Sequence, residues 1–298
     1  MKTVKISTAM VMLALAMLCN ALTAVAQRPL ENTMSAYYAN KMLWNPALTA
    51  AEGNKVYALQ NRSWIGFQGA PVLTNVSGQV AFGKNSSVGV MFMNDRAGVL
   101  IRSYGLVNYG YRVKLAEDEQ VRLGISFAFN SDRIDNSGAG MNDPVIYNNV
   151  KNNYHFDGNF GVMYQRKTLN VGFTVNRIRE NLGGDSEADL ALARIAGYYG
   201  LNINKDEEFY LEPMAMLRFY RGTSPIADLG AMFRYNKMIN LTSVYQTTGN
   251  IRMGLGVVLD DVGEANLYYN TNHKLSNSNS RQYEIGIGIY FLNKKDSN

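Results

Sequence analysis

Residues 120–130 alternate without a break between apolar side chains and small or polar ones. The odd positions hold Val, Leu, Ile, Phe and Phe, whereas the even positions hold Gln, Arg, Gly, Ser, Ala and Asn. Successive side chains of a β-strand point to opposite faces, so this pattern predicts a strand with one apolar face and one polar face. Such a strand has to cover its apolar face with a protein core or with lipid.

The same alternation recurs along most of the chain. It is found in segments 55–64, 72–82, 88–92, 99–113, 120–130, 156–164, 169–175, 191–203, 209–220, 229–235, 239–245, 251–259, 267–269 and 283–291. An even number of strands, here about 14, is typical of bacterial outer-membrane barrels. The sequence therefore predicts an all-β protein whose antiparallel strands close into a transmembrane β-barrel, with lipid outside and a polar interior.

A soluble β-sandwich is the alternative, because alternation alone does not distinguish a protein core from lipid. Three features favour the barrel. The polar faces carry Gly, Ser, Asn, Gln and Arg more than Lys or Glu, and none of the segments has the weaker pattern of an edge strand. Connection lengths also alternate, and those at 131–153 and 178–190 are long. Short turns at one rim and longer loops at the other are typical of a membrane barrel.

Residues 1–26 have the features of a secretory signal peptide. Lys2 and Lys5 precede an apolar stretch at 8–18, and Ala-Val-Ala at 24–26 forms a cleavage site before Gln27. The apolar stretch is too short to span a membrane as a helix. Removal of this leader predicts a mature protein outside the cytoplasm, and the barrel pattern places it in the bacterial outer membrane.

The rest of the chain divides into three parts. Residues 27–54 do not alternate and contain the sequence LWNPAL at 43–48. Asn-Pro marks a turn, and burial of each large apolar side chain is worth about 1.5–3 kcal/mol. We therefore expect 27–54 to form a short hatch that plugs the periplasmic end of the barrel. The alternative is an amphipathic segment on the membrane surface, where Trp is favoured. Residues 55–292 are expected to form the barrel, and 293–298 a short C-terminal tail.

Enzymatic chemistry finds little support in the sequence. His155 and His273 are the only histidines, and no serine is singled out beside them for a Ser–His–acid site. The acidic residues of 185–189 lack the twelve-residue pattern of a calcium loop. Cys19, the only cysteine, lies in the leader, so the mature chain has no disulfide. The net charge of +5 is scattered, unlike the Lys/Arg cluster that nucleic acid requires. We expect no catalytic, cofactor or metal site and no nucleic-acid partner.

Charged side chains occur on the polar phases of several predicted strands, where they would face the barrel interior. They are Arg62, Arg102, Arg112, Arg122, Asp157, Glu212, Arg218, Asp228 and Arg234. Opposite charges inside a closed barrel can pair and block the lumen. A conducting pore would use the same residue types, so the sequence leaves both a plugged barrel and a channel open.

Four short motifs stand at or near the first predicted strands. They comprise Asn45, Pro46 and Ala47; Arg62, Trp64 and Gly66 within 61–67; Gly69, Ala70 and Pro71; and Asn94, Asp95 and Gly98 in an ND-x-x-G turn. Together with the leader and the strand-rich body, these motifs resemble the PorP/SprF family of Bacteroidota outer-membrane proteins. The last predicted strand, 283–291, is similar to the closing strand of that family.

The resemblance implies a non-enzymatic barrel of the type IX secretion and gliding-motility apparatus, which helps to export or anchor secreted proteins at the cell surface. The implied partners are periplasmic proteins of the same apparatus and secreted surface proteins, besides the outer-membrane lipid that any such barrel contacts. The NPA segment also resembles that of the FadL class, which implies instead a channel for diffusive uptake of a hydrophobic solute. A charge-filled lumen would favour the secretion role, and an apolar pocket inside the lumen would favour the transporter.

Overall fold

The computed structural model of this chain describes residues 35–64, 69–134, 153–182, 193–203, 208–220, 224–260, 262–271 and 282–291. The predicted signal peptide at 1–26, the tail at 293–298, Gly66 and His273 lie outside these ranges. Within them, no helix has the length and apolar character needed to cross a membrane.

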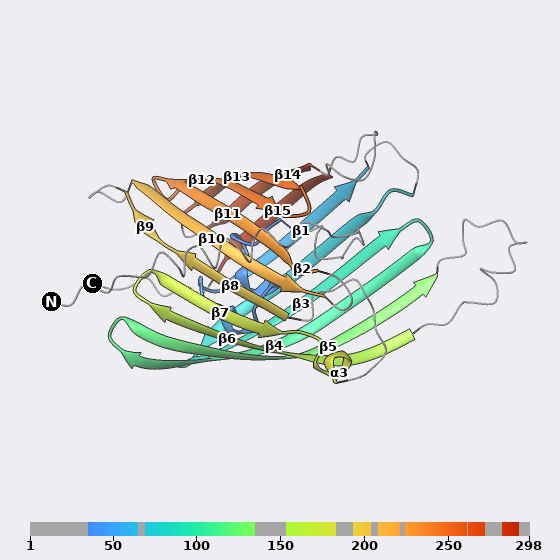
Figure 1. The fold of residues 1–298 in the computed structure, drawn as a ribbon, viewed down its shortest axis with the longest axis horizontal. Helices are drawn as coiled ribbons and strands as arrows, with labels where there is room; N and C mark the ends of the chain where they lie inside the picture. The colour runs from blue at the N-terminus through green and yellow to red at the C-terminus, as the bar shows by residue number, and fades with distance from the viewer. Residues whose placement is uncertain are drawn as a thin grey trace, which may run out of the picture.

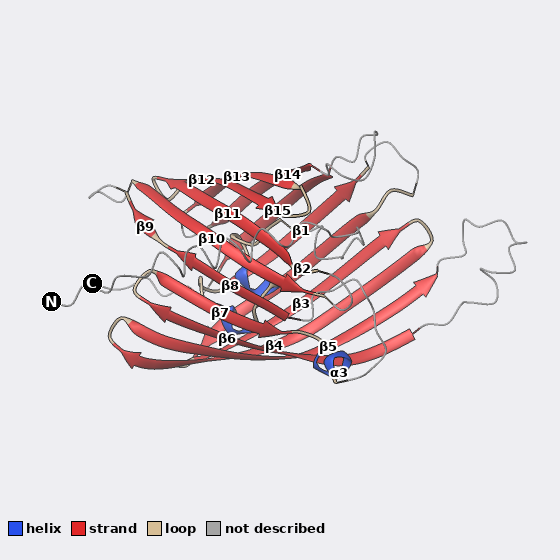
Figure 2. Cartoon of the chain, viewed as in Figure 1, coloured by secondary structure: helices blue, strands red, loops and turns tan. Residues whose placement is uncertain are grey.

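Strands follow one another along the chain and make up most of the regular structure in the described ranges (Figure 2). They are β1 (Lys55–Ser63), β2 (Val72–Phe82), β3 (Ser86–Ala97), β4 (Leu100–Ala116), β5 (Glu119–Ile134), β6 (Asn153–Arg166), β7 (Leu169–Val175), β8 (Ala193–Tyr199), β9 (Leu201–Asn202), β10 (Phe209–Phe219), β11 (Ile226–Tyr235), β12 (Ile239–Gln246), β13 (Ile251–Leu259), β14 (Gly263–Thr271) and β15 (Gln282–Tyr290). The short β9 continues β8 beyond Gly200, and both pair with β10. Counted as one interrupted strand, they bring the total of 15 segments to 14.

The sheet closes on itself (Figure 1). Every paired neighbour is antiparallel, and β1 pairs with β15 from Lys55↔Tyr290 to Ser63↔Gln282. From β1 the pairing continues through β8 to β10, and from β15 it continues back through β14 to β11. Strands β10 and β11 pair with each other and so complete the ring. This closure confirms the predicted antiparallel barrel of 14 strands and leaves no exposed sheet edge along the paired stretches.

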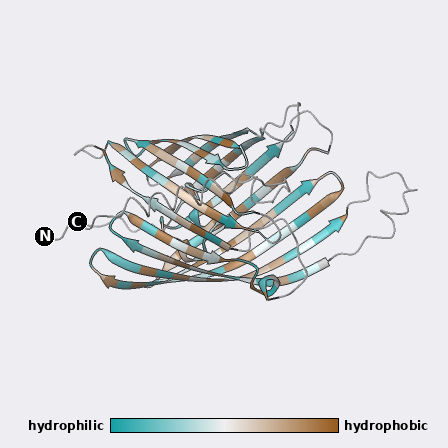
Figure 3. Cartoon of the chain, in the orientation of Figure 1, coloured by the Kyte–Doolittle hydropathy of each residue, from teal (hydrophilic) through white to brown (hydrophobic). Residues whose placement is uncertain are grey.

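The barrel wall has an apolar outer face and a polar inner face, as predicted. In β5, the outward-facing Ile125 and Phe127 are 57% and 60% exposed, whereas the inward-facing Ala128 is 1% exposed. Figure 3 shows the alternation as opposite hydropathy at neighbouring positions along the strands. A soluble protein would bury an apolar surface of this extent, so the outer face has the character of a lipid-facing barrel.

The two long connections lie at one rim of the barrel, opposite a rim that has only short turns. One rim, which we call the short-turn rim, holds the start of β1, the end of β15 and the connections at 83–85, 117–118, 167–168, 203–208, 236–238 and 260–262. The other, which we call the loop rim, receives the connections at 135–152 and 176–192, and the short helix α3 (Ile178–Asn181) belongs to it. The loop rim also has short connections at 98–99 and 247–250. The prediction of short turns at one rim and more variable connections, two of them long, at the other is therefore confirmed.

One residue predicted to face inward, Arg62, faces outward instead. The buried face of β1 carries Tyr57 and Leu59, which are 0% and 2% exposed. Arg62 lies on the opposite face, where its Nε donates to Gln60 Oε1 at 3.1 Å. Both faces of β1 contain apolar residues, so alternation alone did not define the phase. Tyr57 and Leu59 turn inward because they pack against the N-terminal segment inside the barrel.

Residues 35–54, which we call the plug segment, lie inside the barrel (Figure 2). They contain two short 3-10 helices, η2 (Lys41–Leu43) and η3 (Pro46–Leu48), and most of their side chains are buried. Trp44 and Leu48 join buried tyrosines and methionines of the wall in one apolar cluster. The hatch-like segment of the predicted fold is thus confirmed, while its periplasmic position stays a prediction.

We expect Ile125→Arg to impair membrane insertion severely and Arg122→Leu to be mild. Ile125 lies on the exposed outer face of β5, and an Arg at the bilayer midplane costs about 2–4 kcal/mol. Arg122 lies on the inner face, where its Nε donates to Gln165 Oε1 at 2.8 Å. Folding into lipid vesicles, followed by heat-modifiable gel mobility, measures both variants. Equal insertion of the two would show that the faces are wrongly assigned.

Candidate functional site

The plug segment rests on inward-facing glycines. Gly110, Gly124 and Gly161 lie directly opposite one another in β4, β5 and β6. A Cβ atom added at Gly124 would lie 2.2 Å from the backbone nitrogen of Ala47, and one added at Gly161 would lie 2.1 Å from Asn45 Oδ1. Side-chain carbons do not approach other heavy atoms so closely. Glycine at 124 and 161 is therefore what allows the turn at 45–47 to lie against the wall.

The motif Asn45-Pro46-Ala47 forms that turn. Asn45 Oδ1 accepts the backbone N–H of Ala47 at 2.9 Å and caps η3. Pro46 takes the first helical position, where the N–H that proline lacks would have no partner within the helix. Asn45 Nδ2 donates to the Val162 carbonyl of β6 at 3.2 Å. The Asn45 side chain therefore both shapes the turn and fastens it to the barrel wall.

Trp44 holds the same turn against β8. Its ring meets the Tyr198 ring edge-on, with centroids 6.4 Å apart, and its carbonyl accepts from Arg194 Nη1 at 2.9 Å. The Trp44 side chain is buried, as expected from its apolar neighbours in the sequence. Arg194 and Tyr198 were not indicated by the sequence, because no local pattern relates β8 to a residue so far upstream.

A chain of five charged side chains joins the plug segment to the wall. It runs Glu212–Lys41–Glu52–Lys55–Glu264, with successive N···O distances of 2.9, 3.3, 3.4 and 3.3 Å. Glu212 belongs to β10 and Glu264 to β14, so the chain connects two separate parts of the barrel through the plug. Of the five, only Glu212 was predicted as an interior charge. Lys41 and Glu52 lie outside the alternating segments, which is why strand patterns did not reveal them.

The charged chain shifts the pKa values of the plug's own groups. Burial lowers the pKa of Lys41, but the carboxylates of Glu52 and Glu212 outweigh burial and leave the pKa above its usual value. Burial raises the pKa of Glu52, whereas the ammonium groups of Lys41 and Lys55 outweigh it and leave the pKa below its usual value. Both groups are therefore charged at neutral pH, which keeps the chain of ion pairs intact.

We expect the plug segment to loosen in acid as Glu52 becomes protonated. A carboxyl group whose pKa is lower in the folded protein than in the unfolded chain, where it is about 4.3, stabilises the folded state above that pH. Its contribution is lost as the pH falls through the folded pKa. Limited proteolysis of the plug segment across this range measures the effect. Glu52→Gln should weaken the pH dependence, and an unchanged acid response in that variant would contradict the assignment.

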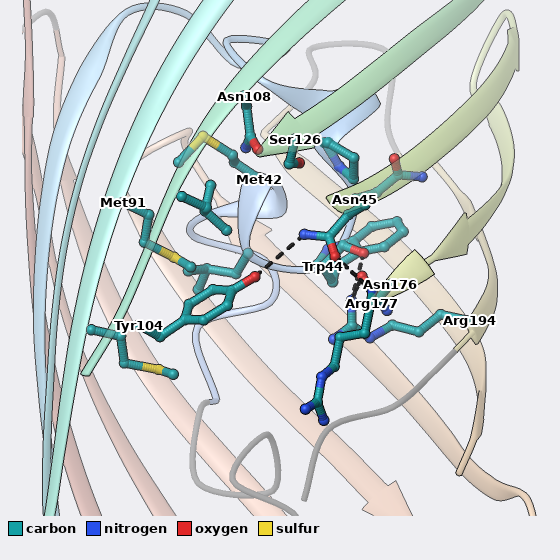
Figure 4. A pocket seen from close by; sticks show the side chains of 15 residues that line it. Met42, Trp44, Asn45, Met91, Tyr104, Asn108, Ser126, Asn176, Arg177 and Arg194 are labelled. Atoms are coloured by element: carbon teal, nitrogen blue, oxygen red, sulfur yellow. Dashed lines mark hydrogen bonds between the residues drawn. The ribbon is translucent and has the colours of Figure 1, made fainter. Parts of the chain in front are cut away.

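A small cavity, which we call the loop-side recess, lies between the plug segment and the loop-rim halves of β3 to β6 (Figure 4). Its volume is about 40 Å³. Methionines and a tyrosine form part of the wall, including Met42, Met91 and Tyr104, and two strand residues, Asn108 and Ser126, contribute polar groups. The recess thus combines an adaptable apolar wall with a polar lining.

Three polar atoms of the loop-side recess have no hydrogen-bond partner within the described part of the chain. They are Trp44 Nε1, Asn108 Oδ1 and Ser126 Oγ, and Asn108 and Ser126 lie opposite each other in β4 and β5. Buried polar groups are nearly always paired, and leaving one unpaired costs about 1–3 kcal/mol. A cavity of about 40 Å³ has room for a few water molecules, so the recess suits water or the tip of a polar side chain.

Apart from Glu212, which pairs with Lys41 of the plug segment, and Arg62, which faces outward, the predicted interior charges bind neighbouring groups rather than pairing across the lumen. Arg218 of β10 and Asp228 of β11 form an ion pair at 2.8 Å with both side chains 0% exposed. Arg102 lies 3.9 Å from Asp132 on the adjacent β5. The others bind as follows: Arg112 the Lys84 carbonyl, Arg122 the Gln165 side chain, Asp157 the Arg179 backbone N–H, and Arg234 the Asn240 side chain. These seven charges therefore form separate local contacts along the wall, and only Glu212 belongs to the chain of ion pairs through the plug.

The remaining motif residues join two connections at the loop rim. The Gly98 N–H donates to the Gly69 carbonyl at 2.9 Å, and both glycines have a left-handed φ, +62° and +74°, a conformation that favours glycine. Pro71 accepts the Ser63 N–H at 3.0 Å, and Asn94 Nδ2 donates to Ser103 Oγ at 3.0 Å. Half-buried motif residues beside them are Trp64, Ala70 and Asp95. These motifs shape the loop rim, whereas the NPA motif shapes the plug.

Across the ranges given for the structure, no three His, Cys, Asp or Glu side chains gather as a metal site needs. His155 lies on β6 as predicted, and the acidic residues of 185–189 fall outside those ranges.

Solved structures with a similar fold are outer-membrane proteins. Omp33 of Acinetobacter baumannii aligns with a TM-score of 0.52 at 6% identity, over 80% of this chain and 98% of that one. The monoaromatic hydrocarbon channel CymD aligns with a TM-score of 0.52 at 13% identity, over 86% and 92%. The toluene transporter TbuX of Ralstonia pickettii aligns with a TM-score of 0.50 at 10% identity, over 83% and 91%. At such identities the similarity shows the fold alone, which is that of an outer-membrane β-barrel. The predicted outer-membrane location is confirmed by this fold together with the family match given next.

Sequence comparison identifies the family. No curated protein matches the chain. The model of the type IX secretion system membrane protein PorP/SprF matches residues 26–289, a range that includes both the plug segment and nearly all of the barrel. The chain therefore belongs to the PorP/SprF family of type IX secretion system membrane proteins.

Proposed function

We propose that this protein is a non-enzymatic outer-membrane component of the type IX secretion and gliding-motility apparatus that helps to export or anchor secreted proteins at the cell surface. The observation that carries this proposal beyond family membership is the fastened plug. The plug segment is bound to β6 by Asn45, to β8 through the Trp44 carbonyl and to β10 by Lys41. A lumen occupied in this way favours a role in which the rims and outer wall, rather than an open pore, contact secreted chains.

In this proposal the short-turn rim faces the periplasm and the loop rim faces the outside, because short turns of outer-membrane barrels are periplasmic. The loop rim, shaped by Gly69 and Gly98, then contacts secreted surface proteins. The short-turn rim contacts periplasmic proteins of the apparatus. The apolar outer wall contacts outer-membrane lipid, as Ile125 and its exposed neighbours require.

A FadL-like channel for diffusive uptake of a hydrophobic solute is the second candidate. The methionine and aromatic wall of the loop-side recess favours it, as does the similarity to the barrels of TbuX and CymD. The size of the recess argues against it. An apolar cavity that takes up benzene has a volume of about 150 Å³, and the recess has about 40 Å³, so the plug segment would have to move before such a solute could enter.

Deletion of the gene and complementation distinguish the two functions. We expect deletion to reduce the secreted proteins at the cell surface, measured by surface labelling and mass spectrometry, and the intact gene to restore them. A pull-down of the tagged protein from native outer membranes should retrieve periplasmic proteins of the apparatus. Unchanged surface proteins together with lost uptake of a hydrocarbon such as toluene would instead support the channel.

A further inference from the structure

Two arginines lie directly opposite each other on the inner face of the barrel wall. Arg112 of β4 pairs with Arg122 of β5, one inward position nearer the short-turn rim than Gly110 and Gly124. The Cβ atoms of directly opposite residues are about 5 Å apart, so the two guanidinium groups share one small region between the plug segment and the short-turn rim. Like charges in this arrangement destabilise a sheet, so the pair needs an explanation.

No carboxylate neutralises this pair within the described part of the chain. No Asp or Glu oxygen of that part lies within 4.0 Å of either guanidinium. Among the ionisable groups close enough to act on Arg122 are Arg112 and Tyr198, but no carboxylate. Glu119, at the start of the same strand, is on the outer face, where its Oε1 accepts the Tyr164 hydroxyl at 2.7 Å. The two positive charges therefore lack a counter-ion.

A network of amide side chains orients Arg122. Its Nε donates to Gln165 Oε1 at 2.8 Å, and Gln120 Nε2 donates to the same oxygen at 2.8 Å. Gln165 Nε2 in turn donates to Asn170 Oδ1 at 2.6 Å, which fixes the direction of the amide. The guanidinium of Arg122 is thus held by its Nε, and both terminal nitrogens keep N–H groups for a ligand.

Arg112 is also held by a neutral acceptor, because its Nη2 donates to the Lys84 carbonyl. Its other guanidinium nitrogens keep their N–H groups. Lys114 lies opposite Gln120, in the next pair on this face toward the short-turn rim, and adds a third positive charge. Both arginines are half-buried, so water screens their charges only in part, and a solute that enters from the short-turn rim can still reach them.

The charge and the spacing of the pair indicate the class of ligand. Two neighbouring guanidinium groups match one compact group with two negative charges and several acceptor oxygens. A phosphate monoester carries a charge of about −1.5 to −2 at neutral pH and three strong acceptor oxygens, and arginine binds such oxygens through parallel hydrogen bonds. A single carboxylate has one charge and two oxygens, and it would leave one guanidinium without a counter-ion.

We propose that Arg112 and Arg122 form a binding site for a phosphate group at the short-turn end of the lumen. Inorganic phosphate, a soluble phosphate monoester and the headgroup of an anionic lipid at the rim all present this group, and the test distinguishes these sources. The inference does not depend on the secretion role, because it rests on the register and the contacts of the two arginines.

The test uses the full chain in a maltoside detergent, which contains no phosphate, and inorganic phosphate as the first probe. We expect binding with a Kd below about 1 mM, measured by titration calorimetry. Arg112→Gln and Arg122→Gln should each weaken binding at least about tenfold, because each removes charge-assisted hydrogen bonds. The matched control is Arg234→Gln. Arg234 is another arginine near the short-turn rim, but it belongs to β11 and binds Asn240, so its replacement should leave phosphate binding unchanged.

Two further probes identify the source of the phosphate group. Glycerol 3-phosphate represents a soluble monoester, and dihexanoyl phosphatidic acid represents a lipid headgroup. Tighter binding of the first supports a soluble ligand, and tighter binding of the second supports a lipid. In either case the proposal requires that Arg112→Gln and Arg122→Gln weaken the binding of the preferred probe.

Four results would overturn the proposal. The first is no binding of inorganic phosphate below about 1 mM. The second is displacement of phosphate by an equal concentration of chloride, which would show an adventitious ion only. The third is tighter binding of the peptide acetyl-Asp-Asp-amide than of any phosphate probe, which would assign the site to carboxylates. The fourth is unchanged phosphate binding by both arginine variants, with heat-modifiable gel mobility showing that they are folded.

Discussion

Arg218→Leu is expected to lower the free energy of unfolding by about 3–5 kcal/mol, because it leaves a buried carboxylate without its counter-ion. Arg218 and Asp228 are both 0% exposed, and Nη2 of the arginine lies 2.8 Å from Oδ2 of the aspartate. Gln246 Nε2 donates to Asp228 Oδ1 at 3.0 Å, and Arg218 Nη1 donates to the Tyr220 hydroxyl at 3.1 Å. The arginine cannot be removed without leaving these groups in an environment that excludes water.

Two further variants test the reason for that loss. The double variant Arg218→Leu/Asp228→Leu should recover most of the stability, because a buried ion pair replaced by apolar residues is often neutral. Arg102→Leu is the matched control. Its side chain is 33% exposed and 3.9 Å from Asp132, so its loss should cost less than about 1 kcal/mol. Urea unfolding in lipid vesicles measures the free energy of unfolding of all three variants. Equal losses for Arg218→Leu and Arg102→Leu would contradict the role of burial.

The strands could be predicted because their signal is local. In a barrel each strand turns one side to lipid and the other to the interior, so alternation appears wherever both sides differ in polarity. The segments expected at 72–82, 169–175 and 251–259 coincide with β2, β7 and β13. The order of pairing followed as well, because sequential antiparallel strands joined by short turns have few other ways to close.

The inner face of β1 shows that alternation does not always reveal which side of a strand faces lipid. Tyr57 and Leu59 are apolar but point inward, because the plug segment provides an apolar surface inside the lumen. A rule that assigns apolar residues to lipid therefore placed Arg62 on the wrong side. Polarity in a sequence indicates what a side chain contacts only when the contents of the lumen are known.

The contacts of the plug segment depend on pairs far apart in the sequence. Lys41 and Glu212, or Trp44 and Arg194, meet only because the barrel closes around residues 35–54. A signal for the plug does exist in the sequence, in the glycines on inward phases of neighbouring strands such as Gly124 and Gly161. Glycines there also permit strand curvature, so by themselves they did not indicate a bound segment.

Gly124→Ala should release the plug segment while leaving the barrel assembled. The added Cβ would lie 2.2 Å from the Ala47 nitrogen, 2.3 Å from the Pro46 carbonyl carbon and 2.6 Å from the Pro46 oxygen. All three are backbone atoms, so no side chain can rotate away to make room. Strand β5 is paired on both sides, with β4 and β6, and the plug segment is therefore the part that moves.

The size of this effect follows from the cost of overpacking, which is typically about 1–3 kcal/mol and raises the population of the released state at least about fivefold. Limited proteolysis within 35–54 should become faster by a similar factor, and single-channel recordings should show a higher conductance than those of the unaltered protein. Gly105→Ala in β4 is the matched control, because its Cβ would meet its nearest heavy atom at 3.9 Å and should change neither measurement. If Gly124→Ala is cleaved and conducts like the control, the inward-facing glycines are not needed to keep the plug segment in place. Lys41, Asn45 and Trp44 must then hold the plug segment against the wall without them.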